Sequence, residues 1–147
     1  MNMRRVQARD LSAINDIANS VLRESYSMEL FTHLFERSSG SFFVAEERGR
    51  VYGFALAVTL SMRTMRLLML AVRSDRQSGG IGRILLDTCK DHARSRMMTD
   101  MVLEVGVDNR RAIEFYGRNG FSIISTIQEY YNDRSDAYVM KCFLPLS

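Results

Sequence analysis

The stretch L-A-V-R-S-D-R-Q-S-G-G-I-G-R-I-L-L, Leu70 to Leu86, decides the fold. Its apolar start predicts the end of a buried strand, and its last residues begin an amphipathic helix that runs to about Arg96. A polar loop between the two ends in Gly79, Gly80 and Gly82. Such a turn leaves free backbone N–H groups at the positive end of a helix, where anions, usually phosphates, bind. The stretch therefore predicts a strand–turn–helix unit with an anion site at the turn.

Strand and helix patterns alternate on both sides of this unit. The expected strands are 3–7, 41–46, 51–60, 65–72, 101–107, 121–127 and 137–143, and the expected helices are 11–21, 30–35, 80–96 and 109–118. This order is typical of an α/β (α+β) sandwich around a mixed sheet. No repeat or linker divides the chain, so we expect one domain, 1–147, with a sheet of about six or seven strands and about four flanking helices.

Composition excludes several classes of protein. The chain has 147 residues, of which 46% are hydrophobic and 25% charged, as in ordinary globular domains, so disordered and collagen-like chains are excluded. No apolar run approaches the ~18 residues of a membrane span, and the first residues lack the apolar core of a secretory signal. The two cysteines, Cys89 and Cys142, do not suggest a disulfide scaffold. We expect a cytoplasmic protein.

Arginine dominates the positive charge. Of the 20 basic residues, 18 are Arg, and the net charge is +3. Arginine suits phosphates and carboxylates, although a bias in genome composition is the favoured explanation for the excess. Four arginines fall in or beside the motifs described here, namely Arg73, Arg76, Arg83 and Arg118. A net charge of +3 without a basic cluster does not support nucleic-acid binding.

The glycine turn fits one phosphate-binding pattern among three. A dinucleotide fingerprint needs G-x-G-x-x-G, and a Walker A loop needs a Lys and a Ser or Thr after its last glycine; neither is present. The pattern Q/R-x-x-G-x-G/A is met by Gln77, Gly80 and Gly82. With its flanking strand and helix, this turn resembles the pyrophosphate loop of the GCN5-related N-acetyltransferase (GNAT) superfamily.

A second stretch, L-E-V-G-V-D-N-R-R-A-I-E-F-Y-G-R-N-G-F, Leu103 to Phe121, resembles a later motif of the same superfamily. The pattern N-x-x-A-x-x-F/L-Y-x-x-x-G-F is met in full, beginning at Asn109. The L-E-V segment and the region Tyr130 to Lys141 are similar to the RimI-type and archaeal N-alpha-acetyltransferase branch, as is Glu24 to Phe31. The resemblance covers nearly the whole chain and implies acetylation of protein N-termini.

The resemblance also implies acetyl-CoA as the co-substrate. Its pantetheine arm would lie between two splayed parallel strands, here Leu70–Val72 and Leu103–Val105, whose backbone would polarise the thioester carbonyl. The implied cofactor-binding residues are Leu70, Ala71, Val72, Gln77, Ser78, Gly79, Gly80, Ile81, Gly82, Arg83, Asn109, Ala112, Phe115, Tyr116 and Arg118. Three positions depart from the usual family residues: Ser74 replaces a common Pro, Ser78 a basic residue or Gly, and Gly106 a frequent Arg.

Two residues are the expected catalysts. Glu104 is the candidate base for the attacking amine, directly or through water, with a solvated strand residue as the alternative. Tyr116 is the candidate acid for the departing CoA thiolate, with a packing role as the alternative. Asn109 would orient the pantetheine arm, or it only caps the following helix, and both roles are compatible.

The expected substrate-binding residues are Glu24, Tyr26, Tyr130 and Tyr131. Aromatic rings and hydroxyl groups suit a short peptide end, and Glu24 is an alternative helper in deprotonation. An aromatic pair in a hairpin is the other interpretation of Tyr130 and Tyr131. An α-amine, with a pKa of about 7.7–8.0 against about 10.4 for Lys, is partly neutral near pH 7, so a modest base suffices.

Other functions stay open at this stage. The first alternative is acetylation of Lys or of a small amine, and the second is a non-catalytic acyl-CoA-binding module; a nucleic-acid-binding domain is the weakest. No metal site is indicated, since His33 and His92 have no companion ligand at suitable spacing. The expected partners are protein N-termini, with ribosomal proteins as candidate targets, and no nucleic acid or membrane. We expect a monomer or weak homodimer.

Overall fold

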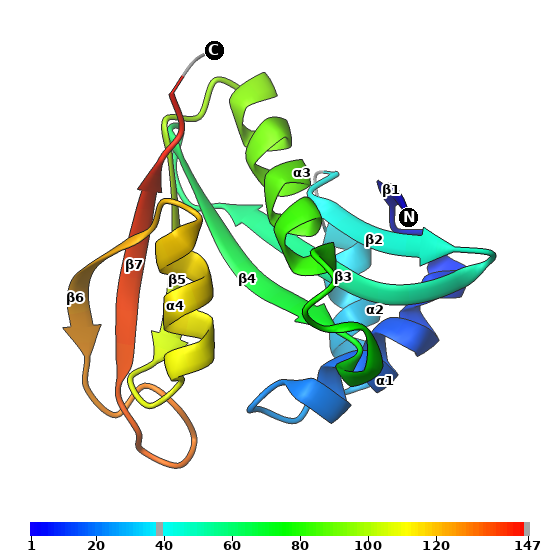
Figure 1. Cartoon of the computed structure of the whole chain (residues 1–147), viewed down its shortest axis with the longest axis horizontal. Helices are drawn as coiled ribbons and strands as arrows, with labels where there is room; N and C mark the ends of the chain where they lie inside the picture. The colour runs from blue at the N-terminus through cyan, green and yellow to red at the C-terminus, as the bar shows by residue number, and fades with distance from the viewer. Residues whose placement is uncertain (38–39, 146–147) are drawn as a thin grey trace.

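The computed structural model describes residues 1–37 and 40–145, which form one mixed sheet with helices on both faces (Figure 1). The strands are β1 Asn2–Arg5, β2 Phe42–Glu47, β3 Arg50–Thr59, β4 Thr64–Val72, β5 Asp100–Gly106, β6 Ser122–Ile127 and β7 Ala137–Phe143. The helices are α1 Leu11–Val21, α2 Met28–Arg37, α3 Ile81–Ser95 and α4 Arg110–Arg118, with 3-10 turns at Ala8–Asp10 and Ser74–Arg76. The predicted fold class is thus confirmed, with boundaries shifted by a few residues.

The sheet order β1-β2-β3-β4-β5-β7-β6 contains one parallel pair, β4–β5, among the described strands. This pair is short: Thr64–Arg66 lie opposite Asp100–Val102, and beyond Arg66 the two strands no longer pair with each other. From there β4 pairs only with β3, and β5 only with β7. The strands diverge visibly in Figure 1, which confirms the predicted splayed pair and opens a space between the two halves of the sheet.

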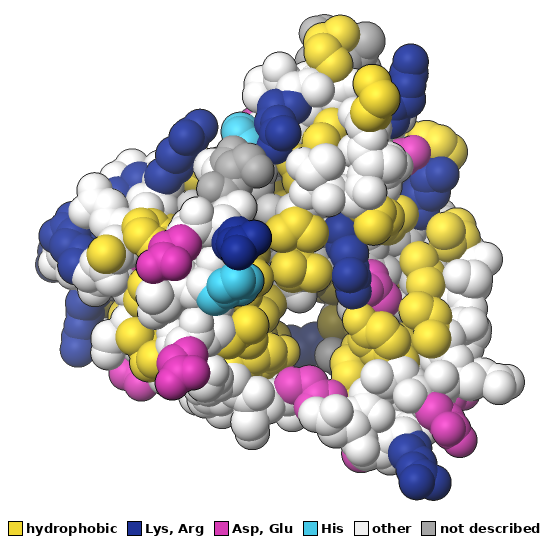
Figure 2. All heavy atoms as spheres, turned by 180° about the vertical axis from the view of Figure 1, so that it is seen from behind, with side chains coloured by type: hydrophobic (Ala, Val, Ile, Leu, Met, Phe, Trp, Pro, Cys, Tyr) yellow, Lys and Arg dark blue, Asp and Glu magenta, His cyan; other side chains and the backbone are white. Residues whose placement is uncertain are grey.

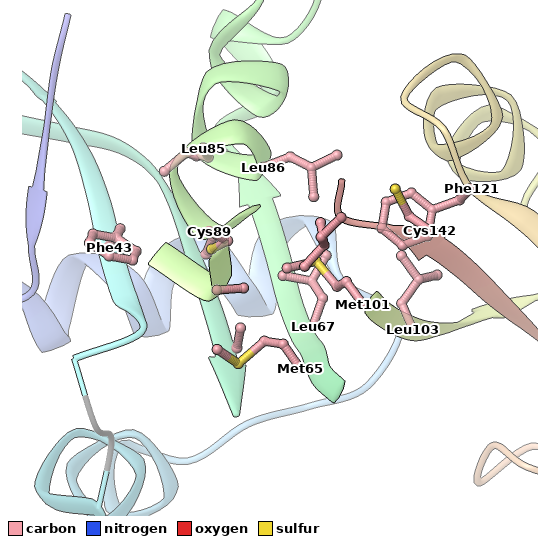
Figure 3. Packing of buried hydrophobic residues seen from close by; sticks show 14 of the residues in the cluster. Phe43, Met65, Leu67, Leu85, Leu86, Cys89, Met101, Leu103, Phe121 and Cys142 are labelled. Carbon is pink, nitrogen blue, oxygen red and sulfur yellow. The ribbon is translucent and has the colours of Figure 1, made fainter. Parts of the chain in front are cut away.

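The structure has two apolar cores, one on each face of the sheet. Strand residues alternate between them, since neighbours such as Phe42 and Phe43 point to opposite faces. On one face, Leu85, Leu86 and Cys89 of α3 pack over β4 and β5, as Figure 3 shows. On the other face, α1 and α2 cover β2 and β3. The α3 core spans the fork and fixes the angle at which β4 and β5 separate.

A charged cluster joins the start of the chain to the sheet. The Arg4 guanidinium donates to Asp10 at 2.7 and 2.9 Å and to Glu46 at 3.0 and 3.1 Å. Asp10 is only 4% exposed, and it also accepts the backbone N–H of Gln7 at 2.7 Å. Burial alone would raise the pKa of Asp10, but the hydrogen bonds from Arg4 and Gln7 outweigh it, so the pKa is lowered.

The substitution Asp10→Asn is expected to destabilise the fold at pH 7 by about 3 kcal/mol, because it leaves Arg4 buried with one carboxylate fewer. Because the folded-state pKa of Asp10 is lowered, the stability from its charge is present above the unfolded-state pKa of about 3.9 and is lost as pH falls through the lower folded value. The loss of stability caused by Asp10→Asn should therefore be smaller at low pH. Urea unfolding at pH 7 and below pH 4 measures it, with the exposed Asp75→Asn as control; equal losses in both variants would contradict it.

Candidate active site

A groove of about 630 Å³ opens where β4 and β5 separate. Its walls come from β4, β5, the first turn of α4, the α1–α2 connection and the β6–β7 loop. Figure 2 shows this face of the molecule hollowed between its two halves. The predicted site residues that line it are Glu24, Tyr26, Leu70, Glu104, Asn109, Ala112, Tyr116, Tyr130 and Tyr131. Both candidate catalysts and all four candidate substrate residues therefore meet in one place.

Glu104 lies on the groove side of β5, while its neighbours Leu103 and Val105 are buried in the core. Its Oε1 accepts hydrogen bonds from Nη2 of Arg66 and, at 3.1 Å, from the hydroxyl of Tyr130. The Tyr130 oxygen is also 3.0 Å from Arg66 Nη2. Within residues 1–37 and 40–145, no group donates to Oε2 of Glu104. The carboxylate is thus held by one oxygen and keeps the other for a ligand.

Arg66 is a groove residue that sequence reasoning missed. Burial lowers its pKa, but the hydrogen bond and charge of Glu104 more than offset this, so that the pKa is raised and the guanidinium stays charged. In the sequence, Arg66 is an isolated charge within a strand pattern, with nothing to indicate a partner 38 residues away.

Tyr116 extends from α4 into the groove between two aromatic rings. Its centroid lies 5.2 Å from that of Phe115 and 5.5 Å from that of Phe121, both in edge-to-face arrangements. Burial raises the pKa of the phenol, helped by the nearby Cys89 and Tyr131. None of the described residues hydrogen-bonds its hydroxyl, which is therefore protonated and available at neutral pH.

Asn109 caps α4, as one of its two predicted roles requires. Its Oδ1 accepts the backbone N–H of Ala112 at 3.2 Å, while the residue also borders the groove. Phe115 packs between Tyr116 and the glycine turn, where a Cβ on Gly82 would lie 3.5 Å from its ring.

The glycine turn presents the anion-binding geometry expected from the sequence. Gly80 is the N-cap of α3 with φ +86°, and no side chain caps the helix. Within the described chain, no backbone or side-chain group accepts a hydrogen bond from the N–H groups of residues 80–83. Gly79 and Ser78 precede it, and Ser78 has φ +74°, a conformation that glycine adopts at no cost. A glycine at position 78 would therefore adopt this conformation without strain.

Two expected side-chain roles in this turn need correction. The amide nitrogen of Gln77 donates to the carbonyl oxygen of Val72 at 2.9 Å, so one of its two N–H groups closes the loop and only the other is left for a ligand. Arg73 pairs with Asp75 at 2.9 Å, and Arg76 with Glu47 at 3.0 Å. Arg83 and Arg118, in contrast, have exposed side chains. Ala71, Val72 and Ile81 are buried, so only their backbone groups can serve a ligand.

A polar bridge crosses the outer end of the groove. Glu24, from the α1–α2 connection, accepts from the backbone N–H of Asn132 at 3.2 Å and from its Nδ2 at 2.6 Å. Arg23 donates to Ser135 at 2.5 Å and pairs with Asp108. The bridge joins the α1–α2 connection to the β6–β7 loop, so it limits what can enter from this side.

Gly106 leaves room for the guanidinium of Arg23, which belongs to this bridge. A Cβ there would lie 2.9 Å from Nη2 of Arg23, so the guanidinium of a residue far away in the sequence occupies the space beside the strand. Arg23 and Asn132 were missed by sequence reasoning, which noted Gly106 as a departure from the family pattern but did not connect it with Arg23.

Tyr130 and Tyr131 form an edge-to-face pair with centroids 4.9 Å apart. They are neighbours in sequence in the loop of the antiparallel β6–β7 hairpin, so they form an aromatic pair in a hairpin and also line the groove. Burial raises the pKa of Tyr131 to about 12, although the charge of Arg23 opposes it. Tyr26 faces them from the opposite wall, and burial raises its pKa too. The wall is therefore aromatic and uncharged.

Several other groups lie outside the chemistry. Both cysteines are free and buried, and burial raises the pKa of the Cys89 thiol to about 12. His92 hydrogen-bonds Ser41 at 2.8 Å, away from the groove. The described residues contain no cluster of His, Cys, Asp or Glu that could hold a metal ion. None of the helices that the structure describes is long and apolar enough to cross a membrane.

The chain is similar to several known proteins in sequence and in fold. The chain is 27% identical over 150 residues to an N-alpha-acetyltransferase of Sulfurisphaera tokodaii, covering 94% of this chain and 90% of the relative. It is 30% identical over 151 residues to the ribosomal protein bS18 alanine N-acetyltransferase of Escherichia coli K12, covering 93% and 99%. The crystal structure of Ard1 from Thermoplasma volcanium superimposes with a TM-score of 0.95 at 32% identity, covering 98% and 97%.

A family model also matches the chain, over a range that contains the candidate site. The model described as acetyltransferase (GNAT) family matches residues 10–121, which include the glycine turn, the splayed strands and both candidate catalysts. A splayed strand pair, an uncapped helix beside it and a carboxylate facing a phenol therefore occur here in the setting of a known enzyme family, and the chain belongs to the acetyltransferase (GNAT) family.

Proposed function

We propose that the protein transfers the acetyl group of acetyl-CoA to the α-amino group of protein N-termini. The observation that carries the proposal is the placement of Glu104 and Tyr116 in one groove between the separated strands. The names of the relatives support the acceptor, since the Sulfurisphaera protein is an N-alpha-acetyltransferase and the Escherichia coli protein acts on an alanine of ribosomal protein bS18. Ribosomal proteins are therefore the first targets to test.

The residues present fit acetyl-CoA. Beyond Arg66, β4 and β5 each turn one unpaired backbone edge towards the groove, and these edges can pair with the amides of the pantetheine arm. The N–H groups from Gly80 to Arg83 suit the pyrophosphate, with the exposed Arg83 and Arg118 as nearby cations. When bound, acetyl-CoA supplies an activated thioester.

Glu104 and Tyr116 divide the proton transfers between them. The neutral amine attacks the thioester carbon, so a C–N bond forms and the C–S bond breaks. The excess proton on the nitrogen passes to Glu104 through its free Oε2, directly or through water. The phenol of Tyr116 protonates the leaving thiolate. Its raised pKa keeps this proton in place until the thiolate, a stronger base than the carboxylates around it, appears.

The acetyl group passes directly between the two substrates. A covalent route needs an activated nucleophile, and the burial that raises the pKa of Cys89 makes its thiol unreactive. Neither cysteine lines the groove. Initial-rate patterns with both substrates varied should therefore be those of a ternary complex, without an acetyl-enzyme.

Gly80→Val is expected to weaken acetyl-CoA binding by at least tenfold. A Cβ-branched residue at φ +86° costs about 1–2 kcal/mol, and the turn relaxes by moving the N–H groups that we assign to the pyrophosphate. Isothermal titration with acetyl-CoA measures the loss. Gly117→Val, at an open position of α4, is the control for a β-branched residue replacing glycine. If Gly80→Val binds acetyl-CoA as tightly as wild type, the pyrophosphate does not bind at this turn.

CoA release tests the proposed function. The protein is incubated with acetyl-CoA and four matched peptides, with a free or blocked N-terminus and with or without an internal Lys. We expect release with both free N-termini, whether or not Lys is present. Release only with Lys-containing peptides would favour the alternative of a lysine or small-amine acetyltransferase. No release with any peptide, together with tight acetyl-CoA binding, would favour a non-catalytic acyl-CoA-binding module.

A further inference from the structure

Arg66 occupies a special place at the fork of the sheet. It is the last residue of β4 that pairs with β5, opposite Val102, and Glu104 lies two residues further along β5. Its guanidinium reaches across the fork to the carboxylate, at the narrow end of the groove. The side chain of Glu104 is 12% exposed and that of Arg66 32%, so the pair is only partly screened by solvent.

We propose that Arg66 makes the site selective for α-amines over lysine ε-amines by neutralising Glu104. This inference rests on the proposed function and gives it a specificity-determining residue. A carboxylate without a cationic partner would attract the ammonium group of a lysine side chain and hold it beside the base that takes its proton. With Arg66 in place the pair is neutral overall, and the site offers no net attraction to a positively charged amine.

The other charged groups of the groove do not restore that attraction. Glu24 is held by Asn132, and Arg23 by Asp108 and Ser135. The remaining titratable groups that face Glu104 are phenols, whose pKa values are raised and which are therefore neutral near pH 7: Tyr26, Tyr116, Tyr130 and Tyr131. Apart from Glu104, the carboxylate among the described residues of the groove is Glu24, at the outer end, and both of its oxygens already accept hydrogen bonds from Asn132.

The preference for α-amines then follows from the different pKa values of the two kinds of amine. At pH 7, roughly one α-amine in seven is neutral, against roughly one lysine side chain in 2,500, from pKa values of about 7.8 and 10.4. A site that accepts only the neutral form prefers the α-amine by roughly two orders of magnitude before any other contact counts.

The wild-type protein offers a first test, which needs no variant. The ratio of kcat/KM for a free N-terminal peptide to that for an N-blocked, Lys-containing peptide should fall roughly tenfold between pH 7 and pH 9, because the neutral fraction of Lys rises while that of the α-amine saturates. A ratio independent of pH would show that the site binds ammonium, and would overturn the inference.

The second test removes the charge. Arg66→Gln is expected to lower the α/ε ratio at pH 7 by about tenfold, since Glu104 then binds and deprotonates lysine ammonium. Arg66→Lys keeps the charge and should keep the ratio. Arg63→Gln, at an exposed position of the preceding turn outside the groove, is the matched control. A folded Arg66→Gln variant with a wild-type ratio would overturn the inference alone; if wild-type protein acetylates no α-amine, the proposed function falls with it.

Discussion

Replacing Glu104 by Gln is expected to lower kcat for a free N-terminal peptide by about 10²- to 10⁴-fold. The amide keeps the shape of the side chain but cannot take the proton from the attacking nitrogen. The hydrogen bond from Tyr130 can persist, while Arg66 loses its ionic partner. Steady-state kinetics with saturating acetyl-CoA measure the effect, because the cofactor does not depend on this carboxylate.

Two comparisons separate chemistry from structure in the Glu104→Gln variant. Glu114→Gln changes an exposed carboxylate of α4 in the same way and should leave kcat unchanged. Thermal unfolding of both variants shows whether the unpaired Arg66 has weakened the fold. If folded Glu104→Gln keeps kcat within threefold of wild type, Glu104 is only a strand residue paired with Arg66, and the base must lie elsewhere.

Tyr116→Phe is expected to slow turnover at least tenfold while acetyl-CoA binding stays nearly intact. The change removes one oxygen, which no described residue hydrogen-bonds, and leaves the stacking with Phe115 and Phe121 in place. The fold should therefore tolerate it. Tyr138→Phe, a half-buried tyrosine of β7 outside the groove, is the control.

The leaving group distinguishes an acid from a packing residue. If Tyr116 protonates the departing thiolate, an acetyl thioester of a more acidic thiol needs less help, and the defect of Tyr116→Phe should shrink with it. A defect of equal size with both donors, or turnover comparable to that of wild type, would reduce Tyr116 to packing.

Much of the fold could be predicted because its signals are local. The strand, glycines and helix of Leu70 to Leu86 are contiguous, and the periodic burial of Ile81, Leu85 and Cys89 follows from helical geometry. The side of the strand on which Glu104 lies follows from simple alternation. The meeting of Glu104 and Tyr116 in one groove came only from the family resemblance, since the two residues lie on different elements.

The remaining features of the site depend on contacts that no local pattern encodes. Arg66 meets Glu104, and Arg23 meets Asp108, across 38 and 85 residues of chain. Gln77 was expected to hold a phosphate because its side chain is a donor, yet a nearby carbonyl competes for it. The sequence also places Arg73 and Arg76 beside the turn, but it does not reveal that both have acidic partners. A cytoplasmic location and a monomeric or weakly dimeric state stay predictions.

The most direct measurement uses one peptide that carries both kinds of amine. A peptide with a free N-terminus and one internal Lys is incubated at pH 7 with the protein and acetyl-CoA, and tandem mass spectrometry locates the acetyl group. The account predicts a single acetyl group on the α-nitrogen, with the lysine unmodified, and loss of this product with Glu104→Gln. Acetylation of the lysine while the N-terminus stays free would contradict it.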